Sequence, residues 1–401
     1  MGAVAPNGIG LEAFWSSLLA GRSGVGPITH FDPKDHPIKI AGEVKGLDLR
    51  EIVPGAKPNR MSRQTQLALA ACKMAVDHAG LTQEFLKRQE PLRMVLGISS
   101  SAADIIEAAK ALIMTHGPDR VRPYMVGACQ PSATAAELIQ LLGVQTSVTT
   151  VSNACPSGLD ALEIATKAIQ AGQADCIVVG GADSPLNATG VAGFGVTGVL
   201  SARTDIPPEQ VSRPFDLGRD GVVLAEGAGF VVLERLDSAL ARGATPYAEV
   251  VGSASMTDAP GAAGMEGIAR TMDLVMRNAA VYPDQIGYIC ANALSHPVMD
   301  ATEARMIHQV FGSRARRIPV SSIRGVMGHP LAPAGILQTI TCTLAMHHGL
   351  LPPTANLERP DPACDLDHVR GGPRGVRVDI ALANAHGVSG ENTTLLIRRA
   401  P

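Results

Sequence analysis

The sequence has few aromatic side chains and no long apolar run. Aromatic residues make up 3% of the 401 residues, with a single tryptophan, whereas 42 residues are glycine. No run approaches the roughly 20 apolar residues that a membrane-spanning helix needs, and the first residues lack the charged and apolar regions of a signal peptide. The sequence therefore predicts no membrane span and a cytoplasmic location.

Charge of either sign is also scarce. Charged residues make up 18% of the chain and the formal net charge is −3, which gives no electrostatic basis for binding nucleic acid. The seven cysteines are scattered without a CxxC pair, as expected of free thiols in a reducing compartment. No set of side chains has the spacing of metal ligands, and no phosphate loop or dinucleotide fingerprint occurs, so we expect no metal.

Length and hydrophobic content predict two core-bearing α/β units, at residues 1–245 and 246–401. Helical spacing of apolar residues predicts helices at 11–19 and 64–78. Short apolar runs predict buried strands at 94–98, at 228–234 and at 176–179, the last ending in a turn at Gly180-Gly181. The second half predicts strands near 249–252, 286–290, 317–321 and 378–383, and helices near 267–280, 301–311 and 335–348. This alternation indicates mostly parallel sheets covered on both faces.

Cys155 stands at a predicted junction of strand, turn and helix. Residues 148–152 are rich in β-branched side chains, Pro156 suits the first position of a helix, and Leu159 and Leu162 mark its buried face. Free N–H groups and the dipole at a helix N-terminus favour a thiolate, the form that attacks a thioester. The alternative is a small buried hydrophobe, which is our interpretation of the other six cysteines.

Two more glycine-rich turns follow predicted strands. His329 is expected at or just before the start of the helix near 335–348, where a neutral imidazole with a lowered pKa can donate Nε2–H to an oxyanion. A capping or core histidine is the alternative. Gly387 and Gly390 follow the strand near 378–383, which suggests backbone bent toward a ligand.

Taken in order, these segments resemble the β-ketoacyl-[acyl carrier protein] synthases of fatty acid and type II polyketide synthesis. The motifs are Asn153-Ala-Cys-Pro-Ser-Gly158, Ser321-Ser322 with Gly328-His329, and the stretch 384–392. The resemblance extends from Gly2 to Ile397. It implies the thiolase fold, an α/β architecture with two similar halves in five α-β-α-β-α layers. It also implies a dimer, either a homodimer or a heterodimer with a second ketosynthase-like subunit.

The resemblance assigns roles by position. In the family, a cysteine takes an acyl group from the phosphopantetheine arm of an acyl carrier protein. Two histidines then help malonyl-carrier protein to lose CO2, and the resulting enolate attacks the acyl-cysteine. Cys155 is implied as the nucleophile and His329 as the second catalytic histidine, and the N–H groups of Cys155 and Val388 as the oxyanion hole. The thiol is expected to be exposed at the mouth of a tunnel. No cofactor is implied beyond the phosphopantetheine of the carrier.

Partner binding is implied at a basic segment. Lys57, Arg60 and Arg63 precede a predicted helix where the family docks its acidic carrier protein. A solvated charge run is the alternative.

The chain departs from the family pattern at several functional positions. Asn292 stands where the family has its first catalytic histidine. Leu294 and His296 replace two threonines that contact pantetheine. Arg324 replaces a lysine, and we expect it to hold structure opposite Glu303, which matches the acidic partner of that lysine.

Two more departures lie in the glycine-rich loop and at the start of the chain. His386 and Val388 replace two phenylalanines of the loop that also contains Gly387 and Gly390. The family's opening strand, which normally precedes Gly2, is missing, so Met1 is a misplaced start or marks a truncation.

Three hypotheses remain. The first is a condensing enzyme with the triad Cys155, His329 and Asn292, in which the amide donates a hydrogen bond but cannot relay a proton. The second is an acyltransferase that does not elongate. The third is a silent partner like a chain-length factor, although such subunits usually carry glutamine at the position of Cys155. The altered triad favours a secondary-metabolite pathway.

Overall fold

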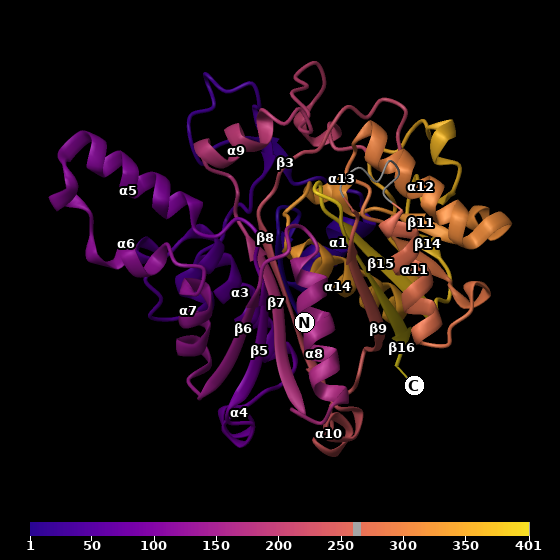
Figure 1. Cartoon of the computed structure of the whole chain (residues 1–401), viewed down its shortest axis with the longest axis horizontal. Helices are drawn as coiled ribbons and strands as arrows, with labels where there is room; N and C mark the ends of the chain where they lie inside the picture. The colour runs from indigo at the N-terminus through magenta and orange to yellow at the C-terminus, as the bar shows by residue number, and fades with distance from the viewer. Residues whose placement is uncertain (260–265, 401) are drawn as a thin grey trace.

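The computed structural model describes residues 1–259 and 266–400 as five layers of helices and sheets (Figure 1). Two six-stranded sheets flank a central helical layer, and further helices cover their outer faces. The first sheet has the order β2-β1-β8-β7-β5-β6 and the second the order β13-β11-β10-β15-β16-β9. This confirms the predicted α/β thiolase-type architecture.

The first sheet comprises β1 (Gly2–Ala5), β2 (Gly8–Ile9), β5 (Leu92–Gly97), β6 (Thr146–Val151), β7 (Cys176–Asp183) and β8 (Gly227–Glu234). The second comprises β9 (Ala248–Thr257), β10 (Tyr288–Cys290), β11 (Pro319–Ser321), β13 (Asp367–His368), β15 (Ile380–His386) and β16 (Glu391–Arg399). Two small sheets pair β3 (Val25–Pro27) with β4 (Ile40–Gly42) and β12 (Leu350–Leu351) with β14 (Arg374–Gly375). The predicted boundary at residue 245 falls between β8 and β9 and stays a prediction.

The central layer consists of α8 (Ser157–Gln170) and α14 (Pro333–His348). The outer layers consist of α3 (Arg63–His78) and α7 (Ala133–Leu142) on one side and α11 (Gly267–Asn278) and α12 (Pro297–Phe311) on the other. The remaining helices are α1 (Leu11–Leu19), α2 (Leu49–Ile52), α4 (Gln83–Arg88), α5 (Ala103–His116), α6 (Pro123–Ala128), α9 (Ala188–Gly195), α10 (Leu236–Ala241) and α13 (Arg324–Met327).

Both sheets are mixed. Two of the five strand pairings are parallel in the first sheet and three of the five in the second, so the prediction of mostly parallel sheets is wrong for the first sheet and confirmed for the second. β5 is parallel to β6 and β7, but β8 returns antiparallel to β7. The second half repeats this arrangement, because β10 is parallel to β11 and β15 whereas β16 returns antiparallel to β15. A direct return beside the preceding strand needs no crossover helix, and apolar content alone does not distinguish it from a parallel strand.

Glycine in β7 serves close packing and not a turn. The strand predicted at 176–179 continues through Gly180 and Gly181 to Asp183. A Cβ at Gly180 would lie 2.3 Å from ring atoms of Phe230 on the adjacent β8, so only glycine leaves room for this ring. The extra length carries the carboxylate of Asp183 to the end of the strand that faces the central helices.

The central helix α14 is buried on nearly every side, as expected of a helix between two sheets. Its threonines satisfy their hydroxyls locally. Thr339, Thr341 and Thr343 each donate to the carbonyl oxygen four residues earlier, at 2.8 Å. These bonds let polar side chains occupy the core without an unpaired group.

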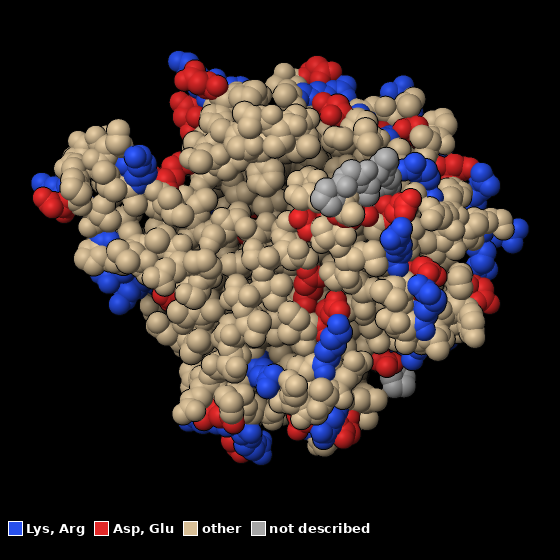
Figure 2. Space-filling view, viewed as in Figure 1, with Lys and Arg blue, Asp and Glu red and all other residues tan. Residues whose placement is uncertain are grey.

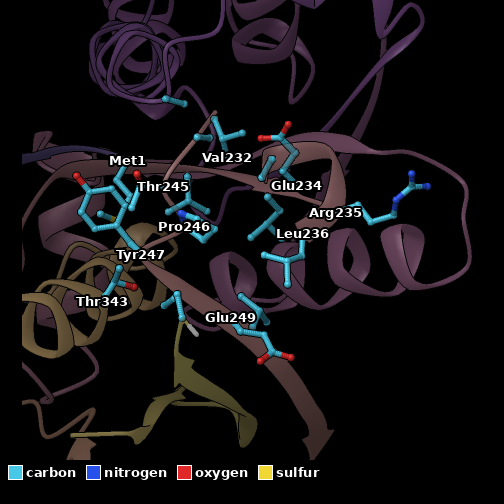
Figure 3. A pocket seen from close by; sticks show the side chains of 18 of the residues that line it. Met1, Val232, Glu234, Arg235, Leu236, Thr245, Pro246, Tyr247, Glu249 and Thr343 are labelled. Atoms are coloured by element: carbon cyan, nitrogen blue, oxygen red, sulfur yellow. The ribbon is translucent and has the colours of Figure 1, made fainter. Parts of the chain in front are cut away.

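The chain opens with a strand at Gly2–Ala5 itself, and not with one that precedes Gly2. β1 pairs with β8 only as far as Gly2 opposite Phe230. Beyond this point, a cavity of about 1070 Å³ lies beside Val231–Glu234 and Met1 (Figure 3). Its lining includes Gln170 at the C-terminal end of α8, whereas Cys155 precedes the opposite end of this helix. Within the described residues, no helix is long and apolar enough to cross a membrane.

Candidate active site

Cys155 lies in a tight turn between β6 and α8. Ala154 adopts φ 50°, a left-handed conformation that is uncommon outside glycine. The Ser157 hydroxyl donates to the Ala154 carbonyl at 2.6 Å and accepts from the Asn153 N–H at 2.8 Å, so one side chain closes the turn. The helix begins at Ser157 with Pro156 as its N-cap, one residue later than predicted. Backbone strain of this kind fixes the direction of the thiol.

The thiol is buried and lies against an imidazole. Cys155 is 6% exposed and packs in an apolar cluster with Leu294 and Leu331, so the prediction of an exposed thiol is wrong. Its Sγ lies 3.1 Å from Nε2 of His329, although 174 residues separate the two in sequence. The structure thus brings together the predicted nucleophile and the predicted second histidine.

His329 lies in a loop between α13 and α14, and not at the start of a helix. Its N–H donates to the Val223 carbonyl at 2.8 Å and its carbonyl accepts from the Ala225 N–H at 2.9 Å. Leu331, two residues on, has φ 62°, and α14 begins only at Pro333. Two β-type bonds therefore fix the backbone that carries the imidazole, and the start of a helix does not.

Burial controls the protonation of this pair. It raises the pKa of the Cys155 thiol to about 12, with Asp183 and Glu391 acting in the same direction and Arg324 opposing them. The predicted lowering by the helix N-terminus is therefore wrong, because desolvation outweighs the dipole. Burial, and then the positive charge of Arg324, hold the pKa of His329 well below its usual value. The resting pair is consequently a neutral thiol beside a neutral imidazole. The neutral imidazole agrees with the prediction, whereas the neutral thiol does not.

Asn292 follows β10 and has a fixed amide. Its Nδ2 donates to the His386 carbonyl at 3.3 Å, and its Oδ1 accepts from Nη2 of Arg324 at 3.3 Å. A carbonyl partner and a cationic partner define which end of the amide is oxygen. One N–H of Asn292 remains for another acceptor.

Glu303 on α12 supports the Asn292 turn and does not pair with Arg324. Its carboxylate accepts from the N–H groups of Asn292 at 3.0 Å and Ala293 at 2.8 Å. Its Oε1 also lies 3.6 Å from Nε2 of His386, which, together with the hydrogen bonds, lowers the pKa of this carboxyl despite burial. Among the described residues no ion pair joins Glu303 to Arg324, so the predicted pairing is wrong.

Leu294 and His296 stand where the resemblance implies threonine hydroxyls, and both have structural roles instead. Leu294 is buried in the apolar cluster around Cys155. His296 caps α12, since its Nδ1 accepts from the N–H groups of Val298 and Met299 at 3.2 and 3.3 Å. The cap explains why α12 begins at Pro297, four residues before the predicted start.

The predicted oxyanion loop follows β15. Gly387 donates to the Glu391 carbonyl at 2.8 Å, and a Cβ on Gly387 would lie 2.2 Å from Oε2 of Glu391. Gly390 has φ 98°, which favours glycine. The Val388 side chain is 54% exposed at the tip of the loop. The roles of Val388 and of the Cys155 N–H as oxyanion donors stay predictions.

The predicted docking residues differ in exposure. Lys57 and Arg60 are exposed. Arg63 points inward, where its Nη2 lies 2.9 Å from Oε1 of buried Glu226 and 2.6 Å from the Val44 carbonyl. Its charge is neutralised internally, which argues against the predicted role of Arg63 in docking.

The sequence analysis missed three polar residues of this region. Asp183, at the end of β7, accepts from the Ala332 N–H at 2.9 Å and so links the two halves. Burial raises its pKa to about 6. Gln338 and Glu391 also lie here, on α14 and β16. Asp183 could have been found from the sequence, because a carboxylate at the end of an apolar strand indicates a functional position. Gln338 could not, because nothing distinguishes it from other polar residues in the middle of a helix.

Comparisons with known proteins agree with this geometry. Family models described as "Beta-ketoacyl synthase, N-terminal domain" and "Beta-ketoacyl synthase, C-terminal domain" match residues 1–239 and 247–358. A "3-oxoacyl-[acyl-carrier-protein] synthase 2" of Synechocystis is 35% identical over 404 residues, covering 100% of this chain and 96% of the relative.

Two solved structures are similar over the whole chain. One is described as the ishigamide ketosynthase/chain length factor, with a TM-score of 0.91 and 30% identity. The other is a type II PKS acyl-carrier protein in complex with its ketosynthase bound to the hexaketide, with a TM-score of 0.90 and 30% identity. Each match covers 100% of this chain and 98% of the other.

Proposed function

The chain belongs to the β-ketoacyl synthase family, and we propose that it is a condensing enzyme of fatty acid or polyketide synthesis that carries its acyl group on Cys155. One observation carries the proposal. The Cys155 thiol lies 3.1 Å from the His329 imidazole, in a strained turn at the start of a central helix. A nucleophile and a base at hydrogen-bond distance are the minimum that acyl transfer from a thioester requires.

In the first half-reaction, the Cys155 sulfur attacks the carbonyl carbon of an acyl thioester and its proton passes to Nε2 of His329. Nε2 of His329 is free to accept this proton because burial and the positive charge of Arg324 keep the resting imidazole neutral. The tetrahedral intermediate then expels the pantetheine thiol of the carrier, which leaves with the proton from His329. The N–H groups of Cys155 and Val388 are the proposed donors to the oxyanion.

In the second half-reaction, a malonyl thioester loses CO2 and the electron pair of the broken bond forms an enolate. The enolate carbon attacks the acyl-Cys155 carbonyl, and the C–S bond breaks to return the thiolate, which takes up a proton. His329 Nε2–H and the remaining N–H of Asn292 are the proposed donors to the enolate oxygen. An amide can supply that hydrogen bond but no proton.

A second candidate function is acyl transfer without elongation. It is favoured by Leu294 and His296, which offer an apolar side chain and an occupied helix cap in place of hydroxyls for the extender. A silent partner subunit is the third candidate, and the pairing of Cys155 with His329 argues against it.

We propose an acyl carrier protein and a second ketosynthase-like subunit, identical or not, as partners. β6 is an edge strand of the first sheet. Nearby, α5 and α6 project from the molecule and expose Ile106, Met114 and Val126, at 54%, 70% and 63% (Figure 1). Figure 2 shows almost no charged side chains over β6 and α7. An apolar arm beside an unpaired strand edge is typical of an interface.

Two further expectations belong to this proposal. The chain is proposed to need no cofactor of its own, because the phosphopantetheine arm arrives with the carrier. A cytoplasmic location is supported by the seven cysteines, all of which are free.

An intact-mass experiment tests the proposed function. The protein is incubated with acyl-carrier protein, weighed, and then given malonyl-carrier protein. We expect an acyl adduct that is absent from Cys155→Ala, followed by a β-ketoacyl product. An adduct without a β-ketoacyl product would favour the second candidate, and no adduct unless another subunit is added would favour the third.

A further inference from the structure

Arg324 is a buried cation that makes no ion pair with a carboxylate within residues 1–259 and 266–400. The residue is 1% exposed and stands among the largest fully buried side chains of the protein. Its Nη2 donates to Oδ1 of Asn292 at 3.3 Å and to Oε1 of Gln338 at 3.1 Å, both neutral amides. Its Nε and Nη1 are buried and make no hydrogen bond among the described residues. An unpaired buried guanidinium is costly, so its retention calls for a ligand.

Neutral amides hold the guanidinium in place, while the charge of Glu303 acts on it without forming an ion pair among the described residues. Nε2 of Gln338 donates to the carbonyls of Cys290, Ala291 and Asn384 at 3.1, 3.0 and 2.9 Å. These three bonds turn Oε1 of Gln338 toward Arg324 and leave it no freedom to rotate. Burial lowers the pKa of Arg324 to about 10, which still leaves it charged near neutral pH.

The guanidinium acts on the reacting groups. It is hydrogen-bonded to Asn292, two residues before Leu294, which packs in the same apolar cluster as Cys155. Consistent with this position, its charge lowers the pKa of both the Cys155 thiol and the His329 imidazole. Two carboxylates, Asp183 and Glu391, raise the pKa of Cys155 and so oppose the effect of Arg324. Asp183 is already saturated by the N–H groups of Ser99, Ser100 and Ala332 and by the Ser100 hydroxyl.

We propose that Nε and Nη1 of Arg324 bind the carboxylate of a substrate whose thioester lies beside Cys155. The inference rests on the proposed acyl chemistry of Cys155 and names its substrate class: a thioester with a free carboxylate. Two substrates have this chemistry, a malonyl extender and a dicarboxylic acyl group that is loaded on Cys155. A guanidinium is the side chain best suited to such recognition.

The proposal has a kinetic consequence for malonyl thioesters. A cation that binds the carboxylate stabilises the ground state, and it loses this interaction as CO2 departs. Such binding lowers KM without raising kcat. Arg324→Gln is therefore expected to raise KM for the malonyl substrate by about tenfold, a typical effect of losing one charged hydrogen bond, and to leave kcat equal or higher. A purely structural role would lower kcat and raise KM for neutral acyl donors as well.

Alkylation of Cys155 tests the site without any condensation. Iodoacetate and iodoacetamide differ mainly in a carboxylate against an amide, and the rates at Cys155 are followed by peptide mass spectrometry. We expect the ratio of the iodoacetate to the iodoacetamide rate to fall by about tenfold in Arg324→Gln. Arg88→Gln, which removes an arginine that is 67% exposed on α4, is the matched control and should keep the ratio. An equal ratio in the unchanged protein and Arg324→Gln would overturn the proposal.

A second measurement covers the case that Arg324→Gln does not fold. In the unchanged protein, malonate should protect Cys155 from iodoacetamide and its diamide, malonamide, should not. Equal protection, or none, would contradict the carboxylate site. Because neither measurement involves a β-ketoacyl product, the site can stand or fall independently of the proposed condensation.

Two substrate arms identify the source of the carboxylate. Loading of Cys155 from succinyl-pantetheine against butyryl-pantetheine tests a carboxylate on the acyl donor. Binding of malonyl-pantetheine against acetyl-pantetheine to acylated protein tests the extender. If only the loading preference is lost in Arg324→Gln, the carboxylate belongs to the acyl donor, and if only the binding preference is lost, it belongs to the extender. If Arg324→Gln changes neither preference, the proposal is overturned.

Discussion

Gly158 of α8 packs so closely on Ala332 that a Cβ at position 158 would lie 2.4 Å from the Ala332 carbonyl oxygen. This contact joins the helix that follows Cys155 to the segment that follows His329. The neighbouring N–H of Ala332 donates to Asp183 of the first sheet. The distance between the thiol and the imidazole is therefore set by backbone contact between the two halves of the chain.

Gly158→Ala tests this contact. The added methyl group must push the two segments apart, which should lower the free energy of unfolding by about 1–3 kcal/mol and slow acylation of Cys155. Thermal unfolding and intact-mass time courses measure the two effects. Gly193→Ala on α9 is the control, because a Cβ there meets nothing within 4 Å. Normal acylation in Gly158→Ala would show that the contact does not position the pair.

The pH dependence of Cys155 alkylation follows from its raised pKa. A thiol reacts as the thiolate, and a pKa of about 12 means that the thiolate fraction grows with pH throughout the accessible range. The iodoacetamide rate should therefore rise about tenfold per pH unit from pH 7 to 9, without a plateau. Stopped-time alkylation with peptide mapping measures it. A plateau near neutral pH would instead indicate the lowered pKa that the helix N-terminus predicts.

Asn292→His restores the residue that the family resemblance implies. A neutral imidazole has one N–H and one acceptor nitrogen, so it can accept from Arg324 as the amide does and donate its N–H to the enolate oxygen, with loss of the bond to the His386 carbonyl. Unlike the amide, it can also relay a proton. We expect faster formation of β-ketoacyl product with little change in Cys155 acylation. Asn292→Ala should slow the condensation by about 10²–10³, the usual effect of losing one oxyanion donor. A condensation rate unaffected by Asn292→Ala would remove Asn292 from the site.

The projecting apolar arm predicts the oligomeric state. Met114→Asp with Val126→Asp places charges on α5 and α6, and should convert a dimer into monomers in sedimentation velocity. Leu240→Asp on α10 is the control, because that side chain is 57% exposed at a site away from the arm. A dimer that survives both charges would place the interface elsewhere, and a monomeric unchanged protein would contradict the predicted dimer.

The basic segment gives a separate prediction. Lys57→Glu with Arg60→Glu should raise KM for acyl carrier protein by about tenfold and leave the KM for a pantetheine thioester unchanged. Arg63→Ala should mainly lower the temperature of unfolding, because it leaves buried Glu226 without its partner. If Arg63→Ala weakens carrier binding and leaves the unfolding temperature unchanged, Arg63 acts in docking and the ion pair with Glu226 is not its main role.

Much of the candidate site was predictable because it follows local rules. The strand, turn and helix around Cys155 are read from β-branched residues, a proline and helical spacing, and the helices at 11–19 and 64–78 match α1 and α3 closely. Position in a motif identified His329 and Asn292. By contrast, β16, α5 and α6 were missed, and the direction of β8 and β16 was not readable, since antiparallel and parallel buried strands share the same apolar composition.

Short motifs in the sequence were enough to place the chain in its family. Turn chemistry and apolar periodicity, which are local properties, predicted many of the helices and strands and singled out Cys155 as the candidate nucleophile. Only the tertiary structure decided the protonation of Cys155, the inward turn of Arg63 and the missing pair between Arg324 and Glu303. Each depends on which distant groups exclude water from a charge or offer it a partner. Desolvation and hydrogen bonding of that kind arise between residues that folding brings together from different elements, such as Cys155 and His329, which are 174 positions apart in the sequence.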